Sequence, residues 1–71
     1  MQKVICEVWA VGVGGVRYKI LVLPDTLSTW RYDENRITGV DITPIENGYD
    51  PRKLNDYLKQ NGLRRLEWWE Q

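Results

Sequence analysis

The stretch KVICEVWAVGVGGVRYKILVL, residues 3–23, decides the fold, because it consists of two apolar arms joined by a glycine-rich turn. Both arms are rich in valine, isoleucine, tryptophan and tyrosine, which favour the pleated, half-buried surface of a strand. Successive side chains of a strand point to opposite faces. We therefore predict a β-hairpin whose side chains separate into two sets by parity.

The length of the turn decides which side chains share a face. A two-residue loop at Gly14-Gly15 would mix charged side chains into the apolar set. A three-residue loop over residues 13–15 places Val8 opposite Ile20 and collects the apolar residues on one face. Such a loop needs a left-handed residue, which glycine supplies at little steric cost. We predict the three-residue loop, because a slip of one residue would turn one whole arm over.

The second face of this hairpin differs from an ordinary solvent face. Glu7 and Lys19 lie on it as a diagonal pair, but Ile5, Trp9 and Leu21 lie on it as well. We therefore expect another segment or a partner to cover part of this face.

The next part of the chain predicts two further strands. Residues 26–36 contain a strand over residues 29–32, because Thr, Trp and Tyr favour strands over helices; the alternative is a short helical turn capped by Asp25. Residues 37–46 form the following strand, in which a glycine indicates a bulge and a proline indicates an edge or a strand end.

The clearest element after the hairpin is a helix over about residues 51–61. Asp50 is a good N-cap and Pro51 suits the first helical position. Apolar side chains three and four positions apart share one face of this helix, and Gly62 suits a left-handed C-terminal cap. Residues 64–71 are predicted as a final strand.

These elements predict an α+β fold and a single domain, residues 1–71. The sheet is small and antiparallel-rich, with the N-terminal hairpin plus two or three further strands, and one α-helix from the C-terminal half packs on one face. Ten basic and ten acidic residues leave no net charge, so the chain lacks the field of a dedicated duplex-DNA binder. The single cysteine, Cys6, is expected as a buried side chain in a reducing compartment. No leader or membrane-length apolar run is apparent, so we expect a cytoplasmic protein without a membrane partner.

Several kinds of chemistry are disfavoured by the sequence. Histidine is absent, so the commonest general base and metal ligand are missing. The glycine run at residues 12–15 lacks the third glycine of a dinucleotide-binding fingerprint, because Arg17 occupies that position. The acidic run at residues 33–35 fails the calcium-loop spacing, because Ile37 stands where an oxygen ligand is needed. We therefore predict no enzyme activity, no metal and no cofactor.

The surplus of apolar sheet surface is the functional clue. One short helix hides one face of a sheet, and exposed aromatic patches mark contact surfaces in which Trp, Tyr and Arg are enriched. We expect a non-catalytic protein-interaction module, which is a homodimer or a small stoichiometric binder or inhibitor of a larger protein. The predicted partner-binding residues are Trp9, Trp30, Arg31, Tyr32, Trp68 and Trp69.

Two alternatives are open at this point. The aromatic side chains can be buried inside the monomer, with one of the consecutive Trp68 and Trp69 packed beside Trp9 under residues 24–36. The chain can also bind single-stranded nucleic acid, with bases stacked on Trp and Tyr at about 1–3 kcal/mol each. The arginines available to hold phosphates are then Arg36, Arg64 and Arg65. The zero net charge and the acidic residues beside these aromatics oppose this alternative.

Overall fold

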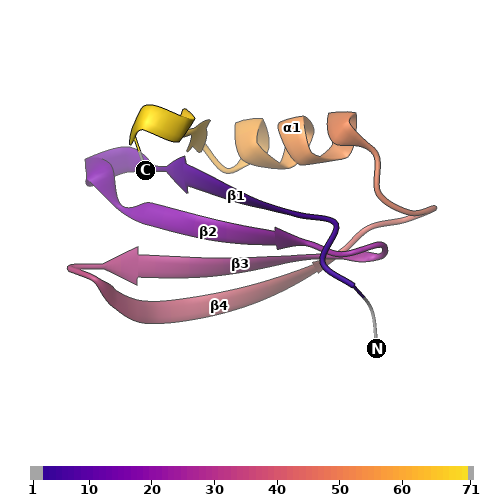
Figure 1. The fold of residues 1–71 in the computed structure, drawn as a ribbon, viewed down its shortest axis with the longest axis horizontal. Helices are drawn as coiled ribbons and strands as arrows, with labels where there is room; N and C mark the ends of the chain where they lie inside the picture. Colours follow the sequence, from indigo (N-terminus) through magenta and orange to yellow (C-terminus); the bar gives the residue numbers. More distant parts are fainter. Residues whose placement is uncertain (1–2, 71) are drawn as a thin grey trace.

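A computed structural model describes residues 3–70 of the chain. It contains a five-stranded antiparallel sheet and one α-helix, so the predicted α+β class is confirmed (Figure 1). The elements are β1 (Cys6–Val11), β2 (Arg17–Val22), β3 (Thr26–Asp33), β4 (Arg36–Pro44), α1 (Pro51–Gln60) and β5 (Arg64–Arg65). The strand order is β4-β3-β2-β1-β5, so the N-terminal hairpin is central and β4 and β5 are the edges.

The hairpin has the predicted register. Val8 lies opposite Ile20, and the loop is a short 3₁₀ turn, η1 (Val13–Gly15), whose two glycines both have φ of 79°. The Gly12 N–H donates to the Val16 carbonyl at 2.8 Å and closes the loop. This positive φ is the reason for glycine here, because a side chain strains a left-handed backbone.

The core lies between α1 and one face of the central strands. Its buried members are Val8, Ala10, Ile20, Val22, Leu27, Leu54 and Leu58. The Tyr57 hydroxyl adds a hydrogen bond of 2.7 Å to Thr29 Oγ1, which ties α1 to β3. Cys6 packs against this core from its predicted face, but it is only partly buried and not buried as predicted.

Both ends of α1 follow the sequence signals. The Asp50 carboxylate accepts the Arg52 N–H at 2.8 Å, and Pro51 occupies the first turn, where no N–H is needed. Gly62 has φ of 65°, and the next N–H, that of Leu63, donates back to the carbonyl of Leu58 at 2.8 Å. This pattern satisfies carbonyls that the helix end leaves open.

Residues 26–33 form a strand, so the helical-turn alternative is excluded. The β3–β4 turn follows, with Glu34 and Asn35 in the left-handed region. The register shifts between Arg31, which pairs with Gly39, and Tyr32, which pairs with Ile37. The extra residue, Thr38, forms a bulge directly before Gly39, where the bulge was predicted, and β4 ends at Pro44 on a sheet edge, as expected.

The prediction of a strand over residues 64–71 was wrong beyond Arg65. After the two residues of β5, the Leu66 N–H still donates to the Trp9 carbonyl at 2.8 Å, and the chain then turns into a 3₁₀ segment, η2 (Trp68–Glu70). The Glu70 carboxylate causes this turn, because it accepts from the Arg64 guanidinium at 2.9 and 3.0 Å and from the Glu67 N–H at 3.1 Å. The predicted strand's last residue lies outside the described range.

Candidate protein-binding face

The helix covers only one side of the sheet. In Figure 1, α1 lies alongside β1, and β3 and β4 lie farther from the helix, beyond β2. Because Val8, Ala10, Ile20 and Leu27 point toward α1, the side chains of opposite parity point away from it. We call this second side the outer face; its strand residues include Trp9, Lys19, Leu21, Ser28, Trp30, Tyr32, Ile37, Val40 and Ile42.

Aromatic side chains occupy the centre of the outer face, and their neighbours hold them in place. The rings of Trp9 and Tyr32 lie 5.3 Å apart at 44°. The Lys19 Nζ lies 5.9 Å from the centre of the Trp9 ring, a cation–π distance. The Trp30 indole N–H donates to Ser28 Oγ at 2.9 Å. A partner therefore meets side chains that are already ordered, which lowers the entropic cost of binding.

Aliphatic side chains of β4 extend the same face toward its rim. Ile37, Val40 and Ile42 pair with β3 residues of the outer face and are 52%, 48% and 63% exposed. These three exposed aliphatic side chains together form an apolar patch beside the aromatic centre.

The predicted binding residues fall into separate groups. Trp9, Trp30 and Tyr32 lie together on the outer face. Arg31 does not join them, because it alternates with Trp30 and Tyr32 along β3 and therefore points to the side of α1.

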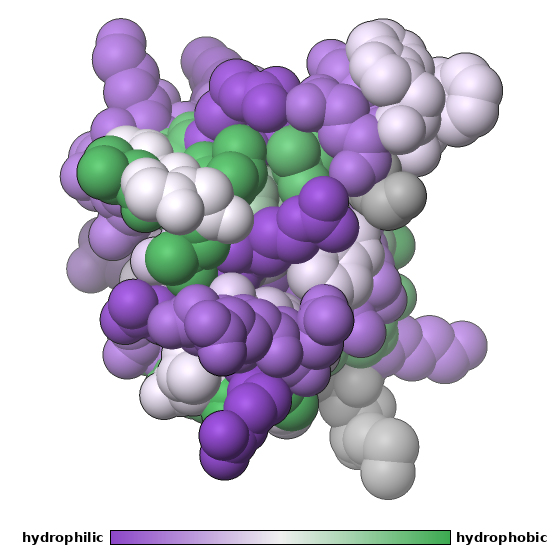
Figure 2. Space-filling view, turned by 90° about the vertical axis from the view of Figure 1, so that its left-hand side faces the viewer, coloured by the Kyte–Doolittle hydropathy of each residue, from purple (hydrophilic) through white to green (hydrophobic). Residues whose placement is uncertain are grey.

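Trp68 and Trp69 form a second aromatic cluster at the β5 edge. Their side chains are 79% and 66% exposed, and their rings meet edge to face with centres 5.7 Å apart. The alternative in which the monomer buries them is therefore wrong. Figure 2 views the end of the molecule that carries this segment: hydrophilic side chains make up most of it, and bulky side chains of intermediate hydropathy project from its upper corner, at the height of η2 in Figure 1.

The three arginines of the nucleic-acid alternative are not grouped. Arg36 begins β4 at one edge of the sheet, whereas Arg64 and Arg65 form β5 at the other. Arg64 is engaged by Glu70, and the hydrogen bonds from Arg64 and from the Glu67 N–H lower the pKa of Glu70 to about 2. Nucleic-acid binding stays a prediction, and no contact among residues 3–70 favours it.

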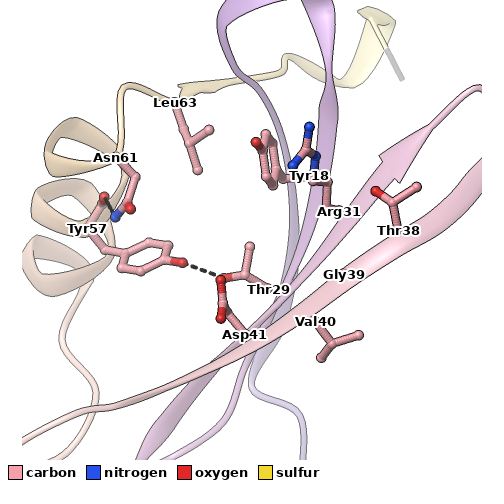
Figure 3. Close-up of a pocket in the computed structure, with 10 residues that line it drawn as sticks. All are labelled: Tyr18, Thr29, Arg31, Thr38, Gly39, Val40, Asp41, Tyr57, Asn61 and Leu63. Carbon is pink, nitrogen blue, oxygen red and sulfur yellow. Dashed lines mark hydrogen bonds between the residues drawn. The ribbon is translucent and has the colours of Figure 1, made fainter.

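A groove on the side of α1 was missed by the sequence reasoning. It has a volume of about 310 Å³, and Tyr18, Thr29, Arg31, Asp41 and Tyr57 are among its lining residues (Figure 3). A helix is about 10 Å wide, which matches only two strand spacings, so α1 leaves this side of β4, and of β3 at Arg31, uncovered. The small and polar side chains at alternate positions of β4 were the sequence signal that no other element covers this side of the strand.

Comparisons with protein-family models, with curated proteins and with solved structures give no match for this chain. Among residues 3–70, no group of three or more His, Cys, Asp or Glu side chains is placed to hold a metal ion. In the same range, no helix is long and apolar enough to cross a membrane.

Proposed function

We propose that this protein is a non-catalytic interaction module that binds a larger protein through its outer face, as a small stoichiometric binder or inhibitor. The observation that carries the proposal is an ordered aromatic centre on a sheet face that no element of the described chain covers. Trp9 and Trp30 are each fixed by a neighbour, and apolar residues of β4 lie exposed beside them. Tryptophan and tyrosine surrounded by apolar side chains are typical of binding hot spots.

The size of the chain suits this role. A standard interface buries about 800 Å² on each partner. The accessible surface of the chain is 5313 Å², so such an interface takes only about 15% of it.

The charges on the outer face support a binding role over a catalytic one. Lys19 Nζ lies 3.6 Å from Glu7 Oε1, so these two charged groups are paired with each other. The proposed location is the cytoplasm, because Cys6 is a free thiol and the fold uses no disulfide.

Site-specific crosslinking in cells that naturally make the protein tests the proposal. A photoreactive phenylalanine analogue replaces Tyr32 on the outer face, and in a matched variant it replaces Asn55, which is exposed on α1. We expect one discrete crosslinked protein from position 32 and none from position 55. When Trp30→Ala is added to the variant that carries the analogue at position 32, the yield of this crosslinked product should fall, because the substitution removes a central anchor of the face.

The two positions also provide the contradicting result. Equal crosslinking from both positions, or a product that Trp30→Ala leaves unchanged, would show that the outer face is not the binding surface. The far-UV circular dichroism of each variant should match the wild type, which excludes unfolding as the cause of a loss.

A further inference from the structure

Strand β4 is an open edge of the sheet. It is nine residues long, and all of them except Thr43 are exposed. Figure 1 shows β4 at the rim of the sheet with no element of the described chain beyond it, and β5 is the strand at the opposite edge. The other edge strand has only two residues. Long apolar edges offer unpaired backbone groups to another strand, and natural proteins usually shorten or cover them.

The backbone groups that β4 presents outward can be identified. The Ile45 N–H donates to the Asp25 carbonyl at 2.8 Å, which marks a hydrogen-bonded position at the end of the β3–β4 ladder. Antiparallel pairs alternate between hydrogen-bonded and non-hydrogen-bonded positions. The odd-numbered residues of β4 from 39 to 43 therefore direct their N–H and carbonyl groups to β3, and Val40 and Ile42 direct theirs away from the sheet.

Two opposite charges flank a gap beside this edge. Figure 3 shows Arg31 and Asp41 on the side of the sheet that faces Tyr57, with Val40 pointing to the other side. Both charged side chains are exposed, and neither takes part in an ion pair within residues 3–70. Gly39 pairs with Arg31, and a Cβ placed on this glycine would meet no atom within 4 Å. The Arg31 guanidinium lies beside Tyr18 in Figure 3, and the open space over Gly39 allows this side chain to turn and extend toward the β4 edge.

We propose that a second copy of this chain pairs antiparallel along β4, with Val40 opposite Val40 of the second copy. In this register Asp41 lies opposite Gly39 of the second copy, beside its Arg31. Two strand spacings of about 4.8 Å place the Cα atoms of that Arg31–Asp41 pair about 10 Å apart, which the two side chains can span. The twofold axis makes two such ion pairs. A register centred on residue 41 would place Asp41 opposite Asp41 of the second copy, and like charges directly opposite each other are destabilising.

This pairing does not depend on the proposed role of the outer face. It uses backbone groups and charges at the rim of the sheet, and it leaves Trp9 and Trp30 uncovered. The product is a continuous ten-stranded sheet whose two outer faces adjoin. Each copy then presents its binding surface on the same side of one dimer.

Disulfide formation tests the register. Val40→Cys and Asp41→Cys are compared in a Cys6→Ala background under mild oxidation. Hydrogen-bonded partners lie about 5.5 Å apart at Cα, within disulfide range, so we expect Val40→Cys to form a covalent dimer. The Cα atoms of the two copies of residue 41 would lie about 8 Å apart, which is beyond disulfide range, so Asp41→Cys should form little covalent dimer. The proposal would be overturned if only Asp41→Cys formed a covalent dimer, or if neither variant did, provided that both variants retain the circular dichroism of the wild type.

Charge exchange tests the ion pairs. We expect Arg31→Asp and Asp41→Arg each to weaken self-association about tenfold in sedimentation equilibrium, because each opposes like charges twice per dimer. An equimolar mixture of these two variants should associate as tightly as the wild type, because the heterodimer of one with the other restores both ion pairs. A mixture that associates no better than either variant alone would overturn the proposal. Trp30→Ala should leave the Val40→Cys disulfide intact, so failure of the outer-face proposal and failure of edge pairing are distinguishable.

Discussion

Alanine in place of Ile20 should cost far more stability than alanine in place of Ile42. Both residues are isoleucines in strands of one sheet, but Ile20 is 0% exposed beneath α1 and Ile42 is 63% exposed on the outer face. This pair therefore compares the covered face with the open face at constant chemistry.

The magnitudes follow from burial. Truncation of a buried isoleucine to alanine costs about 2–5 kcal/mol, because it removes apolar contact and leaves a cavity. Full burial of an isoleucine is worth about 1.5–3 kcal/mol. Ile42 is only about a third buried, so its truncation should cost about 0.5–1 kcal/mol. A domain of this size has about 4–10 kcal/mol of total stability, so Ile20→Ala removes a large part of it.

Urea denaturation followed by circular dichroism measures both free energies of unfolding. The protein should be dilute enough to be monomeric, because self-association through β4 would add stability to the wild type. We expect the midpoint for Ile20→Ala to fall well below that for Ile42→Ala, with similar slopes. Equal losses for the two variants would refute the reasoning, because they would mean that the outer face is buried as deeply as the core.

Three further predictions concern the ends of the chain's elements. Asp50→Ala should lower the free energy of unfolding by about 1 kcal/mol in urea denaturation, because the Arg52 N–H loses its cap. Gly62→Ala should also destabilise, by about 1 kcal/mol, because φ is 65° there; a stability equal to the wild type would contradict the left-handed cap. The Glu70 pKa is below its ordinary value, so its contribution to stability is present above about pH 4.5 and is lost as the pH falls through about 2. An NMR titration of the Glu70 carboxyl should show this midpoint, and a midpoint near 4.5 would contradict the contact with Arg64.

The parts of the fold that depend on local patterns were predictable. The hairpin register followed from parity and two glycines, and the helix ends followed from Asp50 and Gly62. The C-terminal segment was not predictable in the same way. Its turn depends on the Arg64–Glu70 contact, and nothing in the alternation of residues 64–71 distinguishes that contact from a continued strand.

The candidate site was predictable only in part. Parity within the hairpin placed Trp9 on an uncovered face, and the structure places Trp30 and Tyr32, which were also predicted as binding residues, on that same face. The exposed β4 residues were missed as members of this face, because the face of Val40 and Ile42 depends on their pairing with Trp30 and Ser28 of β3, which the alternation within β4 does not give. Arg31 was grouped with its aromatic neighbours by sequence adjacency, although adjacent strand residues point to opposite faces.

Solvent exposure of methyl groups in the isolated, dilute protein tests the open outer face most directly. A soluble paramagnetic agent broadens NMR signals of methyls that solvent reaches, so the signals of Ile37, Val40 and Ile42 should broaden strongly while that of Ile20 stays sharp. Protection of all four to the same degree would contradict the account, because it would show that another part of the molecule covers the outer face.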